Sequence, residues 1–400
     1  MTTIHLVSNS PGEVTTFARP VATALRRKHP DWNLQLCLVP CPYATGAEAR
    51  IIQEWPEKVQ VWTPWETTKA WLRGEGKGKE GAVVFLGGDP WHALLLKHRF
   101  QQPCVAYFPE ESGWEETRWL GGFDRVARGY RPPEADEGQR ALGIGDLRID
   151  AVRARLGNVS SQQQELTLAI FPGSRWMHLK AVLGPFLRTL ELISQQLPEV
   201  RFLLAVSPFV ARDRFVDAAS RPLRLGLECS TGTIEGDLLV TAQGTPVHLC
   251  WGNPYQVMSD CDLALSLPGT NVAELAIAGK PAVIPLSYRV PVGGGGLLGI
   301  IDRLPGFERL KYKLHESKKK RYPLLALPNM LAGRMILPEM FVDDDMANLA
   351  DFLVELLRDE SRRKAIGNEA REVMGGPGAG ARVVELIEQA IVYRSYSTQI

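Results

Sequence analysis

Short, mostly apolar segments that recur along the chain constrain the fold more than any other feature. Thr3–Ser8 and Cys104–Phe108 are examples in the first half, and Leu166–Phe171 and Ala282–Leu286 are examples in the second. Because these segments do not alternate polar and apolar residues, they predict strands that are buried on both faces. Segments with helical spacing, such as Phe17–Lys28, lie between them. This order predicts parallel sheets covered by helices.

The length of the chain indicates more than one domain. A single hydrophobic core rarely serves 400 residues, and residues 136–164 form a polar, glycine-containing stretch after which the strand–helix rhythm restarts. We therefore predict an α/β fold with two Rossmann-like domains facing a central cleft, over residues 1–160 and 161–375. A glycine-rich break precedes a last helix, and we expect residues 376–400 to return to the first domain.

Composition excludes several classes of protein. Lysine plus arginine (46) nearly balance aspartate plus glutamate (45), so the chain lacks the basic field of a dedicated nucleic-acid binder. The six cysteines are scattered, without a Cys-x-x-Cys pair, and predict reduced, mostly buried thiols rather than a zinc site. We found no secretory leader and no apolar run long enough to span a membrane. These features predict a cytoplasmic protein, with peripheral membrane contact as the alternative.

Two predicted strands end in turns suited to phosphate. Phe171 is followed by Pro172-Gly173-Ser174-Arg175, which offers backbone amides, a hydroxyl and a guanidinium at one sheet edge. Ser266 is followed by a second turn and a helix, and this segment contains Gly269, Thr270 and Asn271, with Glu274 one turn further along. The amides could bind a diphosphate and Glu274 the hydroxyls of a ribose. An ordinary tight turn, and helix capping by Thr270 or Asn271, are the structural alternatives.

A third run, Leu327–Arg334, follows the strand-like Tyr322–Ala326 and is expected to form a loop that carries Asn329 and Arg334. In this order the three runs resemble the lipid-A-disaccharide synthase family. The resemblance implies a GT-B fold that transfers an acylated glucosamine from UDP to an acylated, lipid-linked glucosamine 1-phosphate, with inversion at the anomeric carbon. It also implies a donor site made of Gly173, Ser174, Arg175, Gly269, Thr270, Asn271, Glu274, Asn329 and Arg334.

The N-terminal half departs from the family pattern. Glu13 is followed by Val14-Thr15-Thr16 where the family has Ser-Gly-Asp, and Gly87-Gly88-Asp89-Pro90-Trp91-His92 replaces a family run that reads roughly Asp-Ala-Pro-Asp-Phe-Asn. Pro268 stands before Gly269-Thr270 in place of serine. These departures fall mainly on the acceptor side, so the donor assignment is the firmer one.

An inverting transfer needs a base and a stabilised leaving group. We predict Asp89 as the base and Arg175 as the clamp on the departing diphosphate. Glu13, Glu110, Glu111 and His92 are rival bases, and helix capping is the structural alternative for Asp89. No cofactor is expected. No metal site is expected either, because no Asp-x-Asp triplet suited to a divalent cation is evident in the second half, and the acidic run 343–345 is typical of the charged start of a helix.

A lipid substrate predicts contact with a membrane surface. Trp62, Trp65 and Trp71, followed by Lys77 and Lys79, mix interfacial aromatic rings with cations. A second candidate is the apolar loop 293–301 with the basic run 318–321. Packing of the tryptophans in an ordinary core is the alternative.

The expected partners are a UDP-sugar donor, a lipid acceptor and the inner membrane surface, and not nucleic acid; a homodimer is compatible with the sequence. Three other functions remain open. The chain could transfer to a different lipid or polar acceptor, act as a UDP-sugar 2-epimerase, or bind a UDP-sugar without catalysis. A redox dinucleotide enzyme is disfavoured because no Gly-x-Gly-x-x-Gly follows the first strand.

Overall fold

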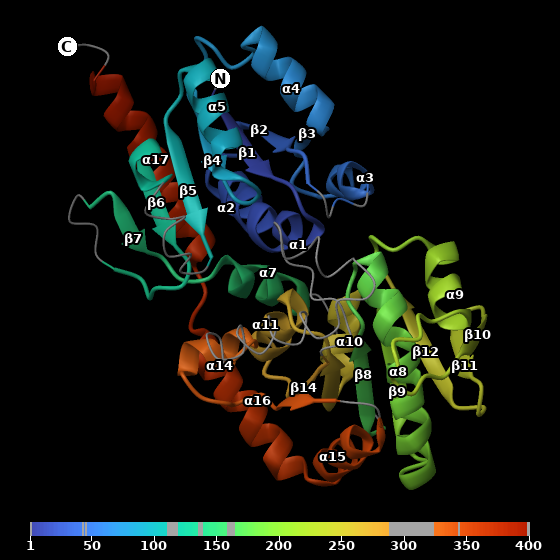
Figure 1. The fold of residues 1–400 in the computed structure, drawn as a ribbon. Coiled ribbons are helices and arrows are strands. Elements are labelled where there is room, and N and C mark those ends of the chain that lie inside the picture. The colour runs from blue at the N-terminus through green and yellow to red at the C-terminus, as the bar shows by residue number, and fades with distance from the viewer. Residues whose placement is uncertain are drawn as a thin grey trace. The chain divides into compact units, whose positions relative to one another are not determined.

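The computed structural model describes residues 2–41, 44, 46–109, 119–134, 139–157, 165–287, 324–342 and 345–397. The chain divides into two compact units, which Figure 1 shows as ribbons. Unit 1 comprises Met1–Ala154 and Gly375–Ile400, and unit 2 comprises Arg155–Met374. The predicted boundary at residue 160 lies outside the described residues.

Unit 1 is built on a seven-stranded sheet in which every neighbouring pair is parallel. The strand order is β3-β2-β1-β4-β5-β6-β7. The central strands β1, β4 and β5 are buried along their whole length. This agrees with their continuous apolar sequences. The strands are β1 (Thr3–Ser8), β2 (Asn33–Leu38), β3 (Gln60–Trp62), β4 (Gly81–Phe85), β5 (Cys104–Phe108), β6 (Arg125–Arg128) and β7 (Ala141–Gly143).

Helices from both ends of the chain pack in unit 1. They are α1 (Pro11–Glu13), a π-helical turn (Val14–Ala18), α2 (Arg19–Lys28), α3 (Glu48–Gln53), α4 (Pro64–Arg73), α5 (Pro90–Phe100), a 3₁₀ turn (Leu120–Gly122), α7 (Leu147–Leu156) and α17 (Ala379–Ser397). Val383 and Ile387 of α17 belong to the same buried cluster as Ile4. The carboxylate of Asp150 accepts hydrogen bonds from the amides of Gly378 (2.6 Å) and Gly380 (2.7 Å) and so fixes the entry to α17.

Unit 2 contains an eight-stranded sheet in the order β10-β11-β12-β9-β8-β13-β14-β15. Its members are β8 (Thr167–Phe171), β9 (Arg201–Val206), β10 (Gly232–Glu235), β11 (Leu238–Thr241), β12 (Pro246–Trp251), β13 (Leu263–Ser266), β14 (Ala282–Leu286) and β15 (Glu339–Phe341). The pairs β10–β11 and β11–β12 are antiparallel, and the others are parallel. Its helices are α8 (Trp176–Gln196), α9 (Arg212–Ser220), α10 (Pro254–Asp260), α11 (Thr270–Ile277), α14 (Leu327–Ala332), α15 (Ala347–Arg358) and α16 (Glu360–Met374).

The polar stretch 136–164, where the sequence predicts the domain boundary, contains strand β7, helix α7 and the boundary between the two units. Two details of the predicted layout further along the chain are wrong. Residues 324–326, at the end of the strand-like segment, are not in a strand, and the loop expected after them is helix α14. In the strand-like segment, Leu325 and Ala326 donate their backbone N–H groups to the carboxylate of Glu339 instead of to a neighbouring strand.

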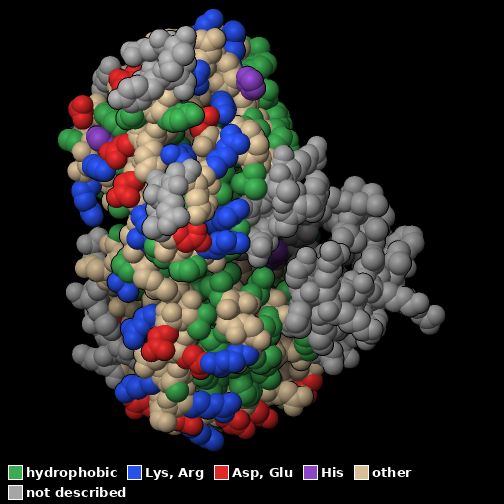
Figure 2. Space-filling model, turned by 90° about the vertical axis from the view of Figure 1, so that its left-hand side faces the viewer, with side chains coloured by type: hydrophobic (Ala, Val, Ile, Leu, Met, Phe, Trp, Pro, Cys, Tyr) green, Lys and Arg blue, Asp and Glu red, His purple; other side chains and the backbone are tan. Residues whose placement is uncertain are grey.

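Side-chain charges are mixed over the face that Figure 2 presents, where lysine and arginine alternate with aspartate and glutamate. This is consistent with a formal net charge of +1 for the whole chain. No helix in the described part of the chain is long and apolar enough to cross a bilayer.

Candidate functional site

The first phosphate-type turn of unit 2 joins β8 to α8. Phe171 is buried at the end of β8, and Gly173 has φ +85°, a left-handed conformation that glycine adopts without strain. Arg175 precedes the first residue of α8 and is exposed, and Gly173 and Ser174 are partly exposed. The turn therefore presents the first amides of a 21-residue helix beside a guanidinium.

The second turn joins β13 to α11 and lies next to the first. Strands β8 and β13 are paired with Ser266 opposite Phe171, and the amide of Leu267 donates to the carbonyl of Phe171 (3.3 Å). A Cβ atom on Gly173 would lie 3.8 Å from Cδ1 of Leu267. Gly269 has φ +144° and precedes α11, which begins at Thr270. The sheet thus brings the two turns together at one edge.

Capping, the alternative for this second turn, does not account for Thr270 and Asn271. The residue at the cap position is Gly269, and no side chain in the described structure caps α11. Thr270 and Asn271 are partly exposed in its first turn. The first amides of α11 are therefore not occupied by a capping side chain.

Glu274 lies inside unit 2, in the middle of α11, and is 5 % exposed. Its Oε1 accepts a hydrogen bond from the hydroxyl of Tyr255 (2.7 Å), and that hydroxyl accepts one from Nη1 of Arg155 (2.8 Å). The guanidinium also lies 5.0 Å from the centre of the Tyr255 ring. Burial raises the pKa of Tyr255, so it keeps its proton and donates to Glu274 at neutral pH. Tyr255 and Arg155 hold Glu274 in one position, and neither was identified from the sequence.

Asn329 has a structural role in unit 2. It is fully buried, and its Nδ2 donates to Leu337 O and to Glu339 Oε1, both at 2.8 Å. Its Oδ1 accepts from the amides of Ile336 and Leu337, also at 2.8 Å. Both donors and both acceptor positions of the amide are occupied. A contact with a donor substrate would require breaking these bonds, so Asn329 does not enter the proposed donor site.

Arg334 is the more accessible of the two residues predicted from the third run. Its side chain is 62 % exposed and forms an ion pair with Glu369 of α16. An exposed ion pair of this kind exchanges its partner for an anion at little cost. Arg334 therefore stays a candidate for contact with a donor.

In unit 1 the loops after β1 and β4 meet. These two strands are parallel neighbours with Val7 opposite Phe85. Glu13 closes a capping box with Ser10, and a Cβ atom on Gly87 would lie 2.4 Å from Oε2 of Glu13. Only glycine at position 87 leaves room for this carboxylate. The two carboxylates predicted from separate loops, Glu13 and Asp89, are thus carried by one sheet edge.

Asp89 occupies the position before the first residue of α5, but its carboxylate makes no capping hydrogen bond. The side chain is exposed, which leaves it accessible to a substrate hydroxyl. The Nδ1 atom of His92 lies 3.2 Å from the carbonyl oxygen of Asp89, and its ring stacks on Trp91 at a centroid distance of 3.7 Å. Burial lowers the pKa of His92, so its ring is neutral at pH 7. Glu110 and Glu111, the other rival bases, lie outside the described residues.

Two buried polar atoms at the same edge were missed by sequence reasoning. Ser8 Oγ and Asn9 Oδ1 have no hydrogen-bond partner among the residues that the structure describes. Ser8 is fully buried at the end of β1. A Cβ atom on Gly88 would lie 2.8 Å from Nδ2 of Asn9, so this amide lies against the loop that carries Asp89. The run Ser8-Asn9-Ser10 at the end of a predicted strand was the signal that could have found them.

The three tryptophans predicted to contact a membrane differ in exposure. Trp62 and Trp71 are partly buried and pack against the cluster around Phe85 and Phe100. Trp65 is 64 % exposed on α4, and the ammonium group of Lys69 lies 5.1 Å from its ring centroid. Leu72, on the same helix, is 57 % exposed. The second membrane candidate, 293–301 with 318–321, lies outside the described residues, as do Asp343 and Asp344.

The described residues contain no group of three or more histidine, cysteine, aspartate or glutamate side chains that could hold a metal ion. All six cysteines are free thiols, and Cys37, Cys104 and Cys261 are buried. Burial raises the pKa of the Cys261 thiol to about 12, so it stays protonated.

Comparison with known proteins gives a family match that includes the two turns of unit 2. A family model described as lipid-A-disaccharide synthetase matches residues 153–292, which contain both turns and Glu274. The resemblance to this family is confirmed. A lipid-A-disaccharide synthase from Methylobacillus flagellatus is 28% identical over 212 residues, which are 53% of this chain and 46% of that protein. One from Burkholderia mallei is 31% identical over 204 residues, 50% of this chain and 42% of that protein. The chain thus matches less than half the length of these relatives.

Solved structures of low sequence identity share the fold of the whole chain. A putative UDP-N-acetylglucosamine 2-epimerase from Listeria monocytogenes has a TM-score of 0.55 at 10% identity, covering 96% of this chain and 94% of that one. MurG from Acinetobacter baumannii has a TM-score of 0.51 at 13% identity, covering 97% and 100%. The fold is therefore of the GT-B type, with two Rossmann-like units, as predicted.

Proposed function

We propose that the chain is an inverting glycosyltransferase of lipid A biosynthesis. It would transfer an acylated glucosamine from UDP to a lipid-linked glucosamine 1-phosphate. The observation that carries the proposal is the pair of turns in unit 2. They lie side by side at one sheet edge, and both fall within the segment that matches the lipid-A-disaccharide synthetase model.

In the proposed donor site the diphosphate binds the amides of Gly173, Ser174, Gly269 and Thr270 together with the guanidinium of Arg175. Backbone amides at two helix starts and a neighbouring guanidinium are suited to a dianionic leaving group. Glu274, oriented by Tyr255, accepts hydrogen bonds from the ribose hydroxyls. The backbone amides and Arg175 supply positive potential from the protein chain itself.

In the proposed reaction Asp89 removes the proton from the acceptor hydroxyl as its oxygen attacks the anomeric carbon. The new carbon–oxygen bond forms as the bond to the UDP oxygen breaks. The diphosphate leaves with the bonding pair, and Arg175 stabilises its charge. Exposure of Asp89 and the lack of a capping hydrogen bond to its carboxylate support this role. Ser8 and Asn9, with buried polar atoms that lack partners among the described residues, would form hydrogen bonds with a polar acceptor headgroup.

We also propose a peripheral contact with a membrane through α4. Trp65 and Leu72 are seven residues apart on this helix and are both exposed, and Lys69 and Arg73 lie on the same side by helical spacing. An apolar stripe flanked by cations is suited to an anionic lipid surface.

The decisive experiment supplies UDP-linked diacylglucosamine and diacylglucosamine 1-phosphate and follows disaccharide formation by mass spectrometry. We expect Arg175→Ala and Asp89→Asn each to lower turnover about 100-fold, the typical loss when one stabilising group or a general base is removed. Asp89→Asn should still bind UDP. Arg358→Ala and Asp31→Asn change exposed residues of the same types away from the turns and should keep wild-type rates.

Each other outcome has a clear meaning. Near wild-type rates in both Arg175→Ala and Asp89→Asn contradict the assigned roles. Tight UDP binding by the wild type, without any product one sugar heavier, would instead identify a UDP-sugar-binding protein. Conversion of the UDP-sugar without an acceptor would identify an epimerase or a hydrolase.

A further inference from the structure

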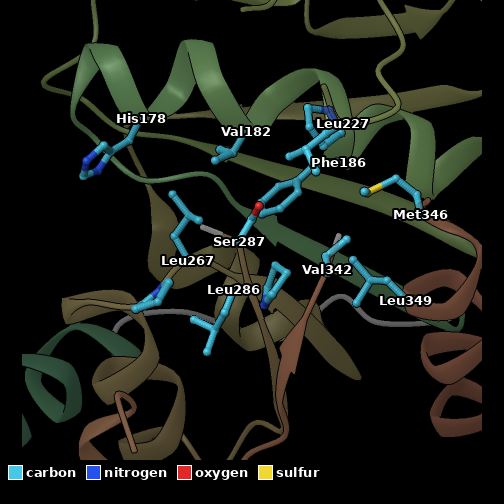
Figure 3. A pocket seen from close by; sticks show the side chains of 13 residues that line it. His178, Val182, Phe186, Leu227, Leu267, Leu286, Ser287, Val342, Met346 and Leu349 are labelled. Carbon is cyan, nitrogen blue, oxygen red and sulfur yellow. The ribbon is translucent and has the colours of Figure 1, made fainter. Parts of the chain in front are cut away.

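Unit 2 contains an apolar pocket at the carboxyl ends of β13, β14 and β15, which Figure 3 shows from close by. Its walls come from α8, from the start of α15 and from the ends of these strands. Counting the part that is open to solvent, it encloses about 710 Å³. It is lined by His178, Val182, Pro185, Phe186, Leu227, Leu267, Pro268, Pro285, Leu286, Ser287, Val342, Met346 and Leu349.

The chemistry of the lining selects the type of occupant. His178 and Ser287 are the two lining residues with polar side chains, and the others are aliphatic, aromatic, proline or methionine. Val182, Phe186 and Met346 are each at most 3 % exposed, so the pocket is lined by side chains of the core itself. A nucleotide or a bare sugar would lose hydrogen bonds to water on entering such a wall. A hydrocarbon chain loses none and gains from the burial of its apolar surface.

The pocket adjoins the proposed donor site. Leu267 and Pro268 line it and directly precede Gly269, the residue before α11. Leu267 also lies beside Gly173 of the other turn. His178, at the edge of the pocket in Figure 3, is in the first turn of α8, three residues after Arg175. A chain attached to a sugar whose diphosphate is held by these turns therefore starts beside the pocket.

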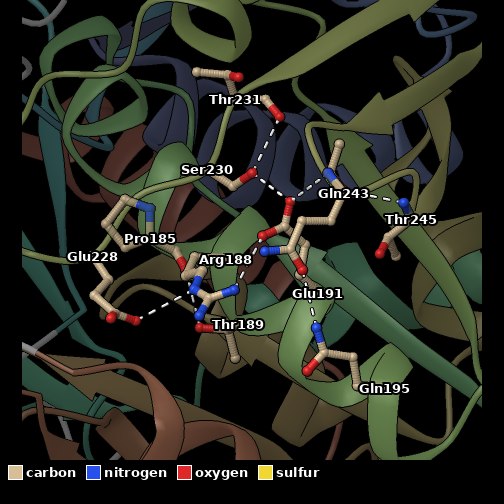
Figure 4. A network of polar contacts seen from close by, with 11 residues as sticks. Pro185, Arg188, Thr189, Glu191, Gln195, Glu228, Ser230, Thr231, Gln243 and Thr245 are labelled. Carbon is tan, nitrogen blue, oxygen red and sulfur yellow. Dashed lines mark hydrogen bonds and ion pairs between the residues drawn. The ribbon is translucent and has the colours of Figure 1, made fainter.

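One wall is held in place by a polar network, shown in Figure 4. This wall is the segment 221–231, which runs along α8 and carries the lining residue Leu227. Within the segment, Ser230 donates its hydroxyl to the buried carboxylate of Glu191 and its amide to the carbonyl of Gly184 (3.0 Å), both on α8. Arg188 Nε donates to Glu228 (3.3 Å). A Cβ atom on Gly184 would lie 2.7 Å from Cβ of Pro222, so the segment packs directly on the helix. The wall is therefore formed before any ligand binds.

We propose that this pocket holds an acyl chain of the donor sugar and thereby selects an acylated UDP-glucosamine over a non-acylated one. This inference rests on the proposed function, because it takes the two turns as the site of the diphosphate. It assigns selection for the acyl chain to unit 2, through the walls formed by α8, α15 and the segment 221–231.

The test measures binding of UDP-glucosamines that carry a single N-acyl chain, from acetyl to decanoyl, in the absence of an acceptor and below the micelle concentration. We expect the Kd of the wild type to fall by up to about fourfold for each added methylene until the pocket is filled, and then to level off. Equal affinity along the whole series, with UDP still bound, overturns the pocket proposal alone. Absence of UDP binding overturns the proposed function instead.

A variant that fills the pocket locates the effect. Val182→Phe adds volume from the middle of the α8 wall, so affinity should level off at a shorter chain, with at least a tenfold weaker Kd for the decanoyl donor. The same change at Val216, which is 40 % exposed on α9, is the matched control and should follow the wild-type series. UDP binding by Val182→Phe reports that the donor turns are folded.

If Val182→Phe fails to fold, Leu227→Ala tests the same wall from the segment 221–231. This side chain is half-buried, and its removal should weaken decanoyl-donor binding severalfold while UDP binding is kept. An unchanged chain-length series in a folded Val182→Phe or Leu227→Ala variant overturns the proposal.

Discussion

The loops that follow the strands of unit 1 and those that follow the strands of unit 2 hold their polar side chains in different ways. In unit 2 the buried side chains of Glu274 and Asn329 have partners within the protein, whereas Trp251 Nε1, at the end of β12, has none among the described residues. Glu274 is bonded to Tyr255, and Asn329 uses both donors and both acceptor positions of its amide. In unit 1 the buried atoms Ser8 Oγ and Asn9 Oδ1 lack partners among the described residues.

This difference matches what each edge is proposed to bind. A donor site that uses backbone amides and one oriented carboxylate can be formed completely in the free protein, because its side-chain partners are internal. An edge with unsatisfied buried atoms is less favourable until a polar ligand supplies the missing hydrogen bonds. We therefore expect substitutions in unit 2 to act through folding or donor affinity. Substitutions at the edge of unit 1 should act mainly on the acceptor.

Asn329→Ala should have the largest effect, because it breaks the four hydrogen bonds of a fully buried side chain in unit 2. The amides of Ile336 and Leu337 would lose their acceptor inside the protein. We expect the free energy of unfolding to fall by about 4 kcal/mol, since each buried group left without a partner costs about 1–3 kcal/mol and neighbours partly relax. Urea denaturation measures this loss.

The neighbouring residue provides the control for Asn329. Met330 is 46 % exposed, and Met330→Ala should change the free energy of unfolding by no more than about 0.5 kcal/mol. A loss below about 1 kcal/mol in Asn329→Ala, together with abolished UDP binding, would return Asn329 to the donor site and break the contrast between the two units.

Tyr255→Phe should have an intermediate effect on donor affinity. The change removes the hydroxyl that donates to Glu274 and accepts from Arg155, and leaves the ring in place. Glu274 then lacks one partner that fixes its orientation toward a ribose. We expect UDP to bind about tenfold more weakly, as a hydrogen bond to a charged group contributes about 1.5–3 kcal/mol.

A UDP analogue with deoxyribose shows whether Tyr255 positions Glu274 for the ribose or only stabilises the fold. If Glu274 binds the ribose, the penalty of Tyr255→Phe should shrink when UDP is replaced by deoxy-UDP, because the affected hydroxyl is missing from the ligand. Tyr393→Phe, at a residue 70 % exposed on α17, is the control and should leave UDP affinity unchanged. The same tenfold penalty for both ligands would show that Tyr255 acts on the fold and not on the ribose contact.

How well each region can be predicted from the sequence depends on whether neighbouring or distant residues determine its structure. Strands β1, β5 and β14 begin and end as the apolar runs indicate, because a strand buried on both faces leaves a continuous signal. The two turns of unit 2 directly follow β8 and β13. Strand β7 has three residues inside a polar stretch and carries no such signal. Its place in the sheet depends on pairing with β6, which is a tertiary contact.

Partners that are distant in sequence were out of reach of local patterns. Arg155, Tyr255 and Glu274 come from three helices, and only the fold brings them within hydrogen-bonding distance. The run Leu327–Arg334 was read as a loop with a ligand contact. Its residues Leu327–Ala332 form α14, and Asn329 on this helix binds the backbone at Ile336 and Leu337. Sequence alone indicated the residue but not its partner.

Trp65→Ala should have the smallest effect, and it tests whether unit 1 carries the membrane contact. A variant that replaced all three tryptophans would also remove core packing, because Trp62 and Trp71 are partly buried. Trp65 is exposed, so its replacement should leave stability within about 0.5 kcal/mol of the wild type. We expect the fraction of protein that floats with anionic liposomes to fall severalfold, because one interfacial aromatic ring is lost. Met177→Ala, which removes an equally accessible apolar side chain from α8 in unit 2, should float like the wild type. If Met177→Ala reduces flotation as much as Trp65→Ala does, the membrane contact is not specific to α4, and the assignment of acceptor and lipid surface to unit 1 loses its support.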